Sequence, residues 1–183
     1  MAIENYRPKK KLTTFYPPQR ILMGPGPSDT HHRVLSAMAR PTLGHLDPVF
    51  AEMMEEIKDL LRYAFLTKNK MTFSVSGPGS VGMEMCFVNM IEPGDKVIVC
   101  RNGVFGSRMI ENVERHGGVA VVVDDKWGEP VDPQKVEDAL KQHPDTKILA
   151  FVHAETSTGV LSDAETLCAL ARKHDCMTIV DTV

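Results

Sequence analysis

Four short polar segments of the chain each follow an apolar run. The first, Ser76-Gly77-Pro78-Gly79-Ser80, lies between a strand-like and a helical segment. Free backbone N–H groups at a helix N-terminus can bind a phosphate, and the hydroxyls of Ser76 and Ser80 could add donors. The segment carries neither the P-loop nor the dinucleotide-binding glycine pattern. On its own it is equally well an ordinary tight turn.

The other three segments offer different chemistry. Asn102–Gly106 places Phe105 at the start of a helix, where its ring could stack on a planar ligand or simply fill the core. His153–Gly159 is rich in hydroxyl side chains, although a helix-capping turn would also explain it. Asp181 stands in an apolar strand, where a carboxylate is better explained by a bound cation than by solvent.

All four segments follow expected parallel strands, whose carboxyl ends form the edge at which such sheets bind ligands. Together they supply a phosphate cradle, a stacking ring, hydroxyl donors and a carboxylate. A phosphorylated, planar heterocycle with a cationic nitrogen requires these groups, and pyridoxal 5'-phosphate (PLP) fits that description.

The elements that must position these segments follow from the apolar pattern. The clearest helix begins with Asp47 as cap and Pro48 at its first position. Short apolar runs alternate with helices of about a dozen residues, which predicts βαβ units and an α/β fold with a mostly parallel sheet covered on both faces. Strands are expected at 20–23, 71–75, 96–100, 119–124, 148–153 and 177–183, and helices at 28–38, 48–65, 79–91, 104–116, 132–143 and 163–174.

The composition is that of a soluble globular protein. The 183 residues carry a net charge of −3, so the charge does not indicate nucleic-acid binding. No stretch is long and apolar enough for a membrane helix. Four cysteines without zinc-like spacing suit a reducing compartment, and no secretory signal is visible. The cytoplasm is therefore expected, with an organelle such as the peroxisome as the alternative. Residues 1–20 are expected to form an extended arm.

At these residues the chain resembles the class V aminotransferases, and within them the alanine–glyoxylate / serine–glyoxylate (serine–pyruvate) group. The resemblance runs collinearly from about Arg20 to Val183. It is carried by Leu22–Ser28, Ser76–Gly79 with Glu84, Val88-Asn89, Glu92–Asp95, Asn102–Gly106, Glu155–Val160 and Val180–Val183.

The resemblance implies the three-layer large domain of the PLP-dependent fold-type I transferases, working as a homodimer. It places Gly77, Pro78, Gly79 and Ser80 in the phosphate loop and Phe105 on the pyridine ring. Thr156 would contact the phenolic oxygen region, Asp181 would pair with the pyridinium nitrogen, and Val183 would pack on the other ring face. Gly44 and His45 would lie in the substrate-side loop.

Three departures from the family pattern matter. Pro78 replaces a small residue and removes one backbone donor, and His45 replaces a small or polar residue, which leaves the amino donor open. The family's Schiff-base lysine comes after Asp181 and its carboxylate-binding arginine much later. Residues 21–183 are therefore expected to be the first part of the large domain, inactive alone.

The implied reaction is PLP-dependent transfer of an amino group from alanine or serine to glyoxylate, giving glycine and a 2-oxo acid. The alternatives within the class are a ureidoglycine–glyoxylate or 3-hydroxykynurenine transaminase. A cysteine desulfurase would stack a histidine where this chain has Phe105. Outside the class, a non-catalytic phosphate-binding α/β module or an inert, poorly folding product remains an alternative.

Overall fold

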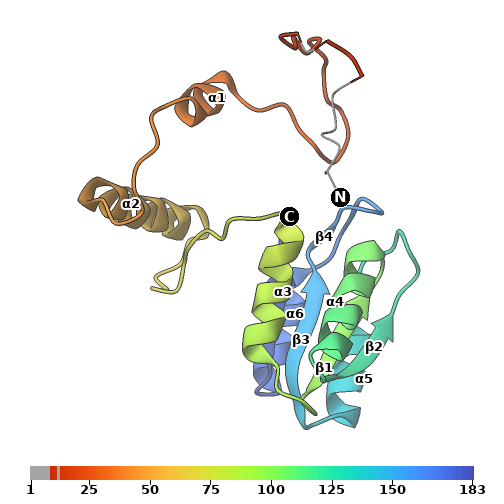
Figure 1. Cartoon of the computed structure of the whole chain (residues 1–183). Coiled ribbons are helices and arrows are strands. Elements are labelled where there is room, and N and C mark those ends of the chain that lie inside the picture. The colour runs from red at the N-terminus through yellow and green to blue at the C-terminus, as the bar shows by residue number, and fades with distance from the viewer. Residues whose placement is uncertain (1–8, 12) are drawn as a thin grey trace, which may run out of the picture. The chain divides into compact units, whose positions relative to one another are not determined.

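The computed structural model describes residues 9–11 and 13–183, so much of the expected arm at 1–20 lies outside the described residues. The chain divides into two compact units, Met1–Leu43 and Gly44–Val183. The larger unit contains every strand found in the described residues (Figure 1).

The main sheet of the larger unit has four parallel strands in the order β2-β1-β3-β6. These strands are β1 Lys96–Arg101, β2 Val119–Asp124, β3 Thr146–Val152 and β6 Met177–Asp181. The chain passes from β1 to β2 on one side and then to β3 on the other side of β1. Loops that follow β1 and β3 therefore leave the sheet in opposite directions, which makes this pair the topological switch point of the sheet.

Helices cover both faces of this sheet (Figure 1). Successive residues of β1 alternate between the two layers: Val97 and Val99 pack towards α3 Gly79–Met90 and α4 Val104–Arg115. Ile98 and Cys100 pack towards α5 Pro133–Gln142 and α6 Ala164–Lys173. The side chains of Phe87 and Phe151 are fully buried, one in each layer. The expected α/β fold with a parallel sheet between two helical layers is confirmed.

Local sequence signals account for the starts of three helices. The side chains of Asp47, Asp132 and Asp163 accept hydrogen bonds from the first turns of α2 Pro48–Ala64, α5 and α6. Pro48 and Pro133 occupy first helical positions. These starts agree with the sequence prediction.

Three local expectations are wrong. Residues 71–75 form no strand: Met71 and Phe73 are exposed, and the segment has no neighbouring strand to supply ladder hydrogen bonds. Residues 20–23 are likewise exposed and irregular. Helix α1, His32–Met38, begins later than expected, because Asp29 accepts from the N–H of Leu22 and the side chain of His31 caps the helix.

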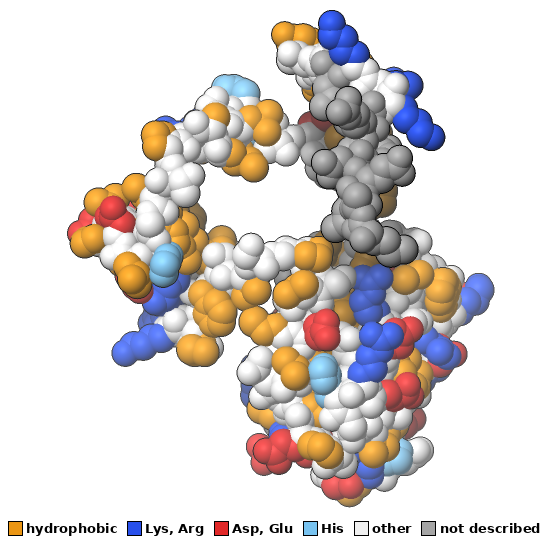
Figure 2. Space-filling view, in the orientation of Figure 1, with side chains coloured by type: hydrophobic (Ala, Val, Ile, Leu, Met, Phe, Trp, Pro, Cys, Tyr) orange, Lys and Arg blue, Asp and Glu red, His pale blue; other side chains and the backbone are white. Residues whose placement is uncertain are grey.

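Apolar side chains are exposed along α2. None of its residues is buried, and Leu60 is 67% exposed. Figure 2 shows these side chains among charged ones. In the described part of the chain, every helix is too short or too polar to cross a lipid bilayer.

Candidate functional site

The turn before α3 and the end of β6 line the same cavity. Gly77, Pro78 and Gly79 of the turn and Asp181 and Val183 of the strand end line a cavity of about 520 Å³. A Cβ placed on Gly79 would lie 3.8 Å from Cγ2 of Val183, so the turn and the strand end are in close reach. Two segments a hundred residues apart in sequence thus meet at the carboxyl edge of the sheet.

The N-terminus of α3 is open to an anion. Its N-cap residue, Pro78, makes no side-chain cap, while the N–H of Val81 is already bonded to the Pro78 carbonyl at 2.8 Å. Gly77 has a φ of 154°, and a Cβ there would also lie 3.1 Å from Val81, so glycine is required at this turn. The N–H groups of Gly79 and Ser80 begin the helix and can donate to a ligand.

Arg108 connects two of the predicted cofactor residues. Its Nη1 donates to the Ser80 hydroxyl at 2.5 Å, and its guanidinium lies 5.0 Å from the ring centroid of Phe105. Phe105 and Arg108 are both half-buried on the first turns of α4. Sequence pattern does not single out Arg108, because its contacts join residues of two different helices.

Glu155 is a second site residue that sequence pattern does not single out. In the structure it is buried, with only 1% of its surface exposed. Its Oε2 accepts the N–H groups of Phe105 and Gly106 at 3.2 and 3.3 Å. Its Oε1 accepts the N–H and hydroxyl of Ser157 at 3.1 and 2.6 Å, and the Ser157 hydroxyl accepts from Val104 N–H at 3.0 Å. A buried carboxylate therefore caps α4 from a different loop.

The loop that carries Glu155 is a small hairpin, β4 Ala154–Glu155 with β5 Val160–Leu161, which was not expected from the sequence. Thr156 follows β4 and is half-buried. The N–H of His153 donates to the carbonyl of Asp181 at 2.8 Å, which ties the hairpin to the end of β6. The Asp181 carboxylate accepts the N–H of Val183 at 3.1 Å.

The structure thus brings the four polar segments to one edge of the sheet, although several predicted residues do not line the cavity itself. Ser76 is exposed beside it, Ser80 and Phe105 lie on the first turns of α3 and α4, and Thr156 lies in the β4–β5 hairpin. Gly44 and His45 form a turn closed by the bond from Asp47 N–H to the Gly44 carbonyl, at 3.0 Å. They do not line the cavity either.

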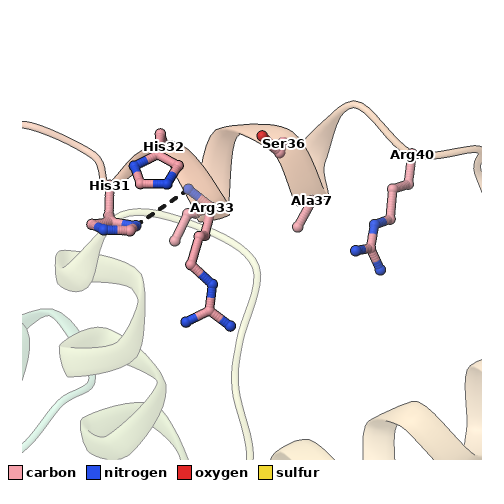
Figure 3. A pocket seen from close by; sticks show the side chains of 7 residues that line it. His31, His32, Arg33, Ser36, Ala37 and Arg40 are labelled. Atoms are coloured by element: carbon pink, nitrogen blue, oxygen red, sulfur yellow. Dashed lines mark hydrogen bonds between the residues drawn. The ribbon is translucent and has the colours of Figure 1, made fainter.

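A second hollow runs along α1 in the unit Met1–Leu43 (Figure 3). His31, His32, Arg33 and Arg40 border it, all of them exposed. It contains none of the residues predicted for the cofactor, and its walls come from a single short helix and the chain next to it.

Comparison with known proteins agrees with this geometry. Residues 24–183 match the family described as aminotransferase class V. The chain belongs to the class V aminotransferases.

Several of the similar proteins carry glyoxylate in their names. Alanine–glyoxylate aminotransferase of Drosophila melanogaster is 38% identical over 92% of this chain and 43% of its own length. The (S)-ureidoglycine–glyoxylate transaminase of Bacillus subtilis is 36% identical over 91% of the chain and 40% of its own length. The crystal structure of alanine–glyoxylate aminotransferase from Nostoc sp. superimposes with a TM-score of 0.91 at 41% identity, covering 96% of the chain and 46% of that structure. The chain thus spans less than half the length of these relatives.

Membership of this class implies PLP, and the residues present fit that cofactor. The open N-terminus of α3 suits a phosphate, and the Asp181 carboxylate suits a cationic ring nitrogen. The cavity volume lies within the range of small-molecule sites.

Proposed function

We propose that this class V aminotransferase chain holds PLP and serves the transfer of an amino group from alanine or serine to glyoxylate. When bound, PLP supplies the aldehyde and the electron-accepting ring that amino transfer requires. The observation that carries the proposal is the shared cavity of the α3 turn and Asp181. This cofactor carries both a phosphate and a cationic ring nitrogen, and the cavity lining includes a suitable partner for each.

Each predicted residue has a proposed role in this site. Gly77, Gly79 and Ser80 bind the phosphate through backbone N–H and hydroxyl groups, and Ser76 adds a hydroxyl. Asp181 keeps the ring nitrogen protonated, because an opposite charge within a few ångströms favours the charged form. The remaining roles, proposed from the resemblance, are ring stacking by Phe105, a ring contact by Val183, a contact to the phenolic oxygen by Thr156, and a substrate-side loop at Gly44 and His45.

The wider organisation is proposed on the same basis. Residues 21–183 form the first part of the PLP-binding large domain, the enzyme works as a homodimer, and it resides in the cytoplasm or in an organelle such as the peroxisome. The substrates are small amino acids and 2-oxo acids, with no nucleic-acid or membrane partner.

Binding to the chain tests the cofactor proposal directly. Pyridoxamine 5'-phosphate is the suitable probe, because it lacks the aldehyde that would attach to surface lysines. We expect saturable binding of one equivalent, measured by calorimetry. Only weak, non-saturating binding would contradict the proposal.

The donor is tested in a protein that carries this chain together with the Schiff-base lysine. Glycine formation from glyoxylate is compared with alanine, serine and (S)-ureidoglycine as donors. We expect alanine or serine to be preferred. The similarity to the Bacillus subtilis transaminase favours (S)-ureidoglycine as the second candidate, and a preference for it would replace our assignment.

A further inference from the structure

The positively charged guanidinium of Arg108 lies in an electrostatically unfavourable place. Arg108 lies on the second turn of α4 and bonds Ser80 at the start of α3, so the uncapped positive end of α3 lies beside it, while the Glu155 carboxylate already caps α4. Among the residues that the structure describes, no carboxylate lies within ion-pair distance of its guanidinium. An anion bound here would balance this charge.

The neighbouring residues limit the kind of anion. Ser80 is the last residue of the segment proposed to bind phosphate and lies in the first turn of α3, and Phe105 is the ring proposed to stack on the cofactor. Pro78 has no backbone N–H, so this turn has one donor fewer than a turn with any other residue at that position. A guanidinium can replace the missing donor with a charged one and matches the geometry of phosphate oxygens.

We propose that Arg108 is a phosphate-binding residue, which supplies the positive charge for the phosphate monoester of the cofactor. This inference rests on the proposed function and adds a residue to its site. The competing explanation is that Arg108 only ties α4 to α3 through its contacts with Ser80 and Phe105. The two explanations differ in one respect: a phosphate ligand matters only when the phosphate is present.

The experiment therefore compares two probes that differ by the phosphate alone, pyridoxamine 5'-phosphate and pyridoxamine. Their affinities are measured by calorimetry for the wild-type chain and for Arg108→Gln, Arg108→Lys and Arg115→Gln. Arg115 is the matched control, because it lies on the same helix, loses the same charge and is 73% exposed in the last turn. Circular dichroism checks that each variant is folded.

For Arg108→Gln we expect the affinity for pyridoxamine 5'-phosphate to fall about ten-fold or more, as for one charge-assisted hydrogen bond. The affinity for pyridoxamine should change less than about two-fold, since that probe offers no acceptor to the lost charge. Arg108→Lys should recover part of the loss, and Arg115→Gln should bind both probes as the wild type does.

Three results would overturn the inference. Equal losses for both probes in Arg108→Gln would show a purely structural role, as would unchanged affinity for the phosphorylated probe. A wild-type chain that binds pyridoxamine 5'-phosphate no better than pyridoxamine would remove the proposed phosphate site altogether. The two results with Arg108→Gln leave the proposed function standing, and the wild-type result does not.

Discussion

The Glu155 carboxylate accepts the backbone N–H of Phe105 at 3.2 Å, although the two residues are 50 positions apart. The bond joins the loop after β1 to the loop after β3, at the point where the strand order reverses. It fixes the start of α4 and with it the backbone that carries Phe105. The orientation of the proposed stacking ring therefore depends on a residue from another loop.

Glu155→Gln tests this relationship at nearly constant size. Each carboxylate oxygen of Glu155 accepts two hydrogen bonds from N–H or O–H donors. In glutamine, an NH2 group replaces one of these oxygens and would face two donors with donors of its own. We expect the free energy of unfolding to fall by about 2 kcal/mol, the usual effect of leaving a buried donor unpaired. Urea unfolding provides the measurement. Glu129→Gln, at an exposed carboxylate, is the matched control and should change stability little.

Gly103→Ala tests the same Glu155 hydrogen-bond network by placing a methyl group against the Glu155 side chain. Gly103 has extended backbone with φ of 179°, which alanine adopts without strain. Its Cβ, however, would lie 2.4 Å from Cγ and Cδ of Glu155, so the buried carboxylate must move. We expect a loss of about 2 kcal/mol, as for other overpacked sites.

The double variant Gly103→Ala/Glu155→Ala isolates this clash. Removing the Glu155 side chain removes the nearest obstacle and leaves the Ser157 hydroxyl, 2.6 Å from the new Cβ, so the two losses should be less than additive. Additive losses would mean that the alanine at 103 acts through something other than Glu155. Gly82→Ala, on α3 with open space around the new methyl group, should hold or raise stability.

Asp181→Asn should weaken cofactor binding more than Phe105→Leu does. The first removes a charge at nearly constant shape, while the second removes stacking surface only. Loss of a close ion pair shifts a pKa by about 1–3 units, and one unit corresponds to about 1.4 kcal/mol. The affinity for pyridoxamine 5'-phosphate should therefore fall by about ten-fold or more at neutral pH. Unchanged affinity in Asp181→Asn would remove the central role given to this residue.

Alkaline pH should destabilise the fold through its buried thiols. Burial raises the pKa of Cys176 from 9.0 to about 11 and raises that of Cys100 further. In the unfolded chain these thiols ionise near their ordinary pKa, so the stability from keeping them neutral is complete below pH 9.0 and declines above it. Unfolding free energies measured from pH 8 to 11 should fall more steeply in wild type than in Cys100→Ala/Cys176→Ala. Parallel curves would contradict this assignment.

The parallel sheet could be predicted because its signals are local. Apolar runs such as 96–100 and 148–153 have the length of buried strands, and aspartates such as Asp132 cap the helix that follows them. Residues 71–75 alternate apolar and polar side chains, as many strands do, and yet form no strand. A strand also needs a neighbour, and sequence pattern does not show whether one is present.

The site was predictable to a similar degree. The turn at Gly77–Gly79 and the carboxylate of Asp181 stood out, since glycine clusters and charges in apolar runs are rare enough to notice. Glu155 and Arg108 did not, because their importance lies in contacts with residues on other segments. A buried glutamate and an exposed one look alike in sequence until the fold places N–H groups around one of them.

Strand β6 pairs with β3 and carries Asp181 as its last residue. Single elements can open in local fluctuations that leave the rest of a domain folded. An opening of β6 would carry Asp181 away from the α3 turn and dismantle the cavity, while β1 and its two neighbours stay paired. A ligand that bridges the turn and Asp181 can bind only the closed form, so ligand binding and the docking of this strand are parts of one equilibrium.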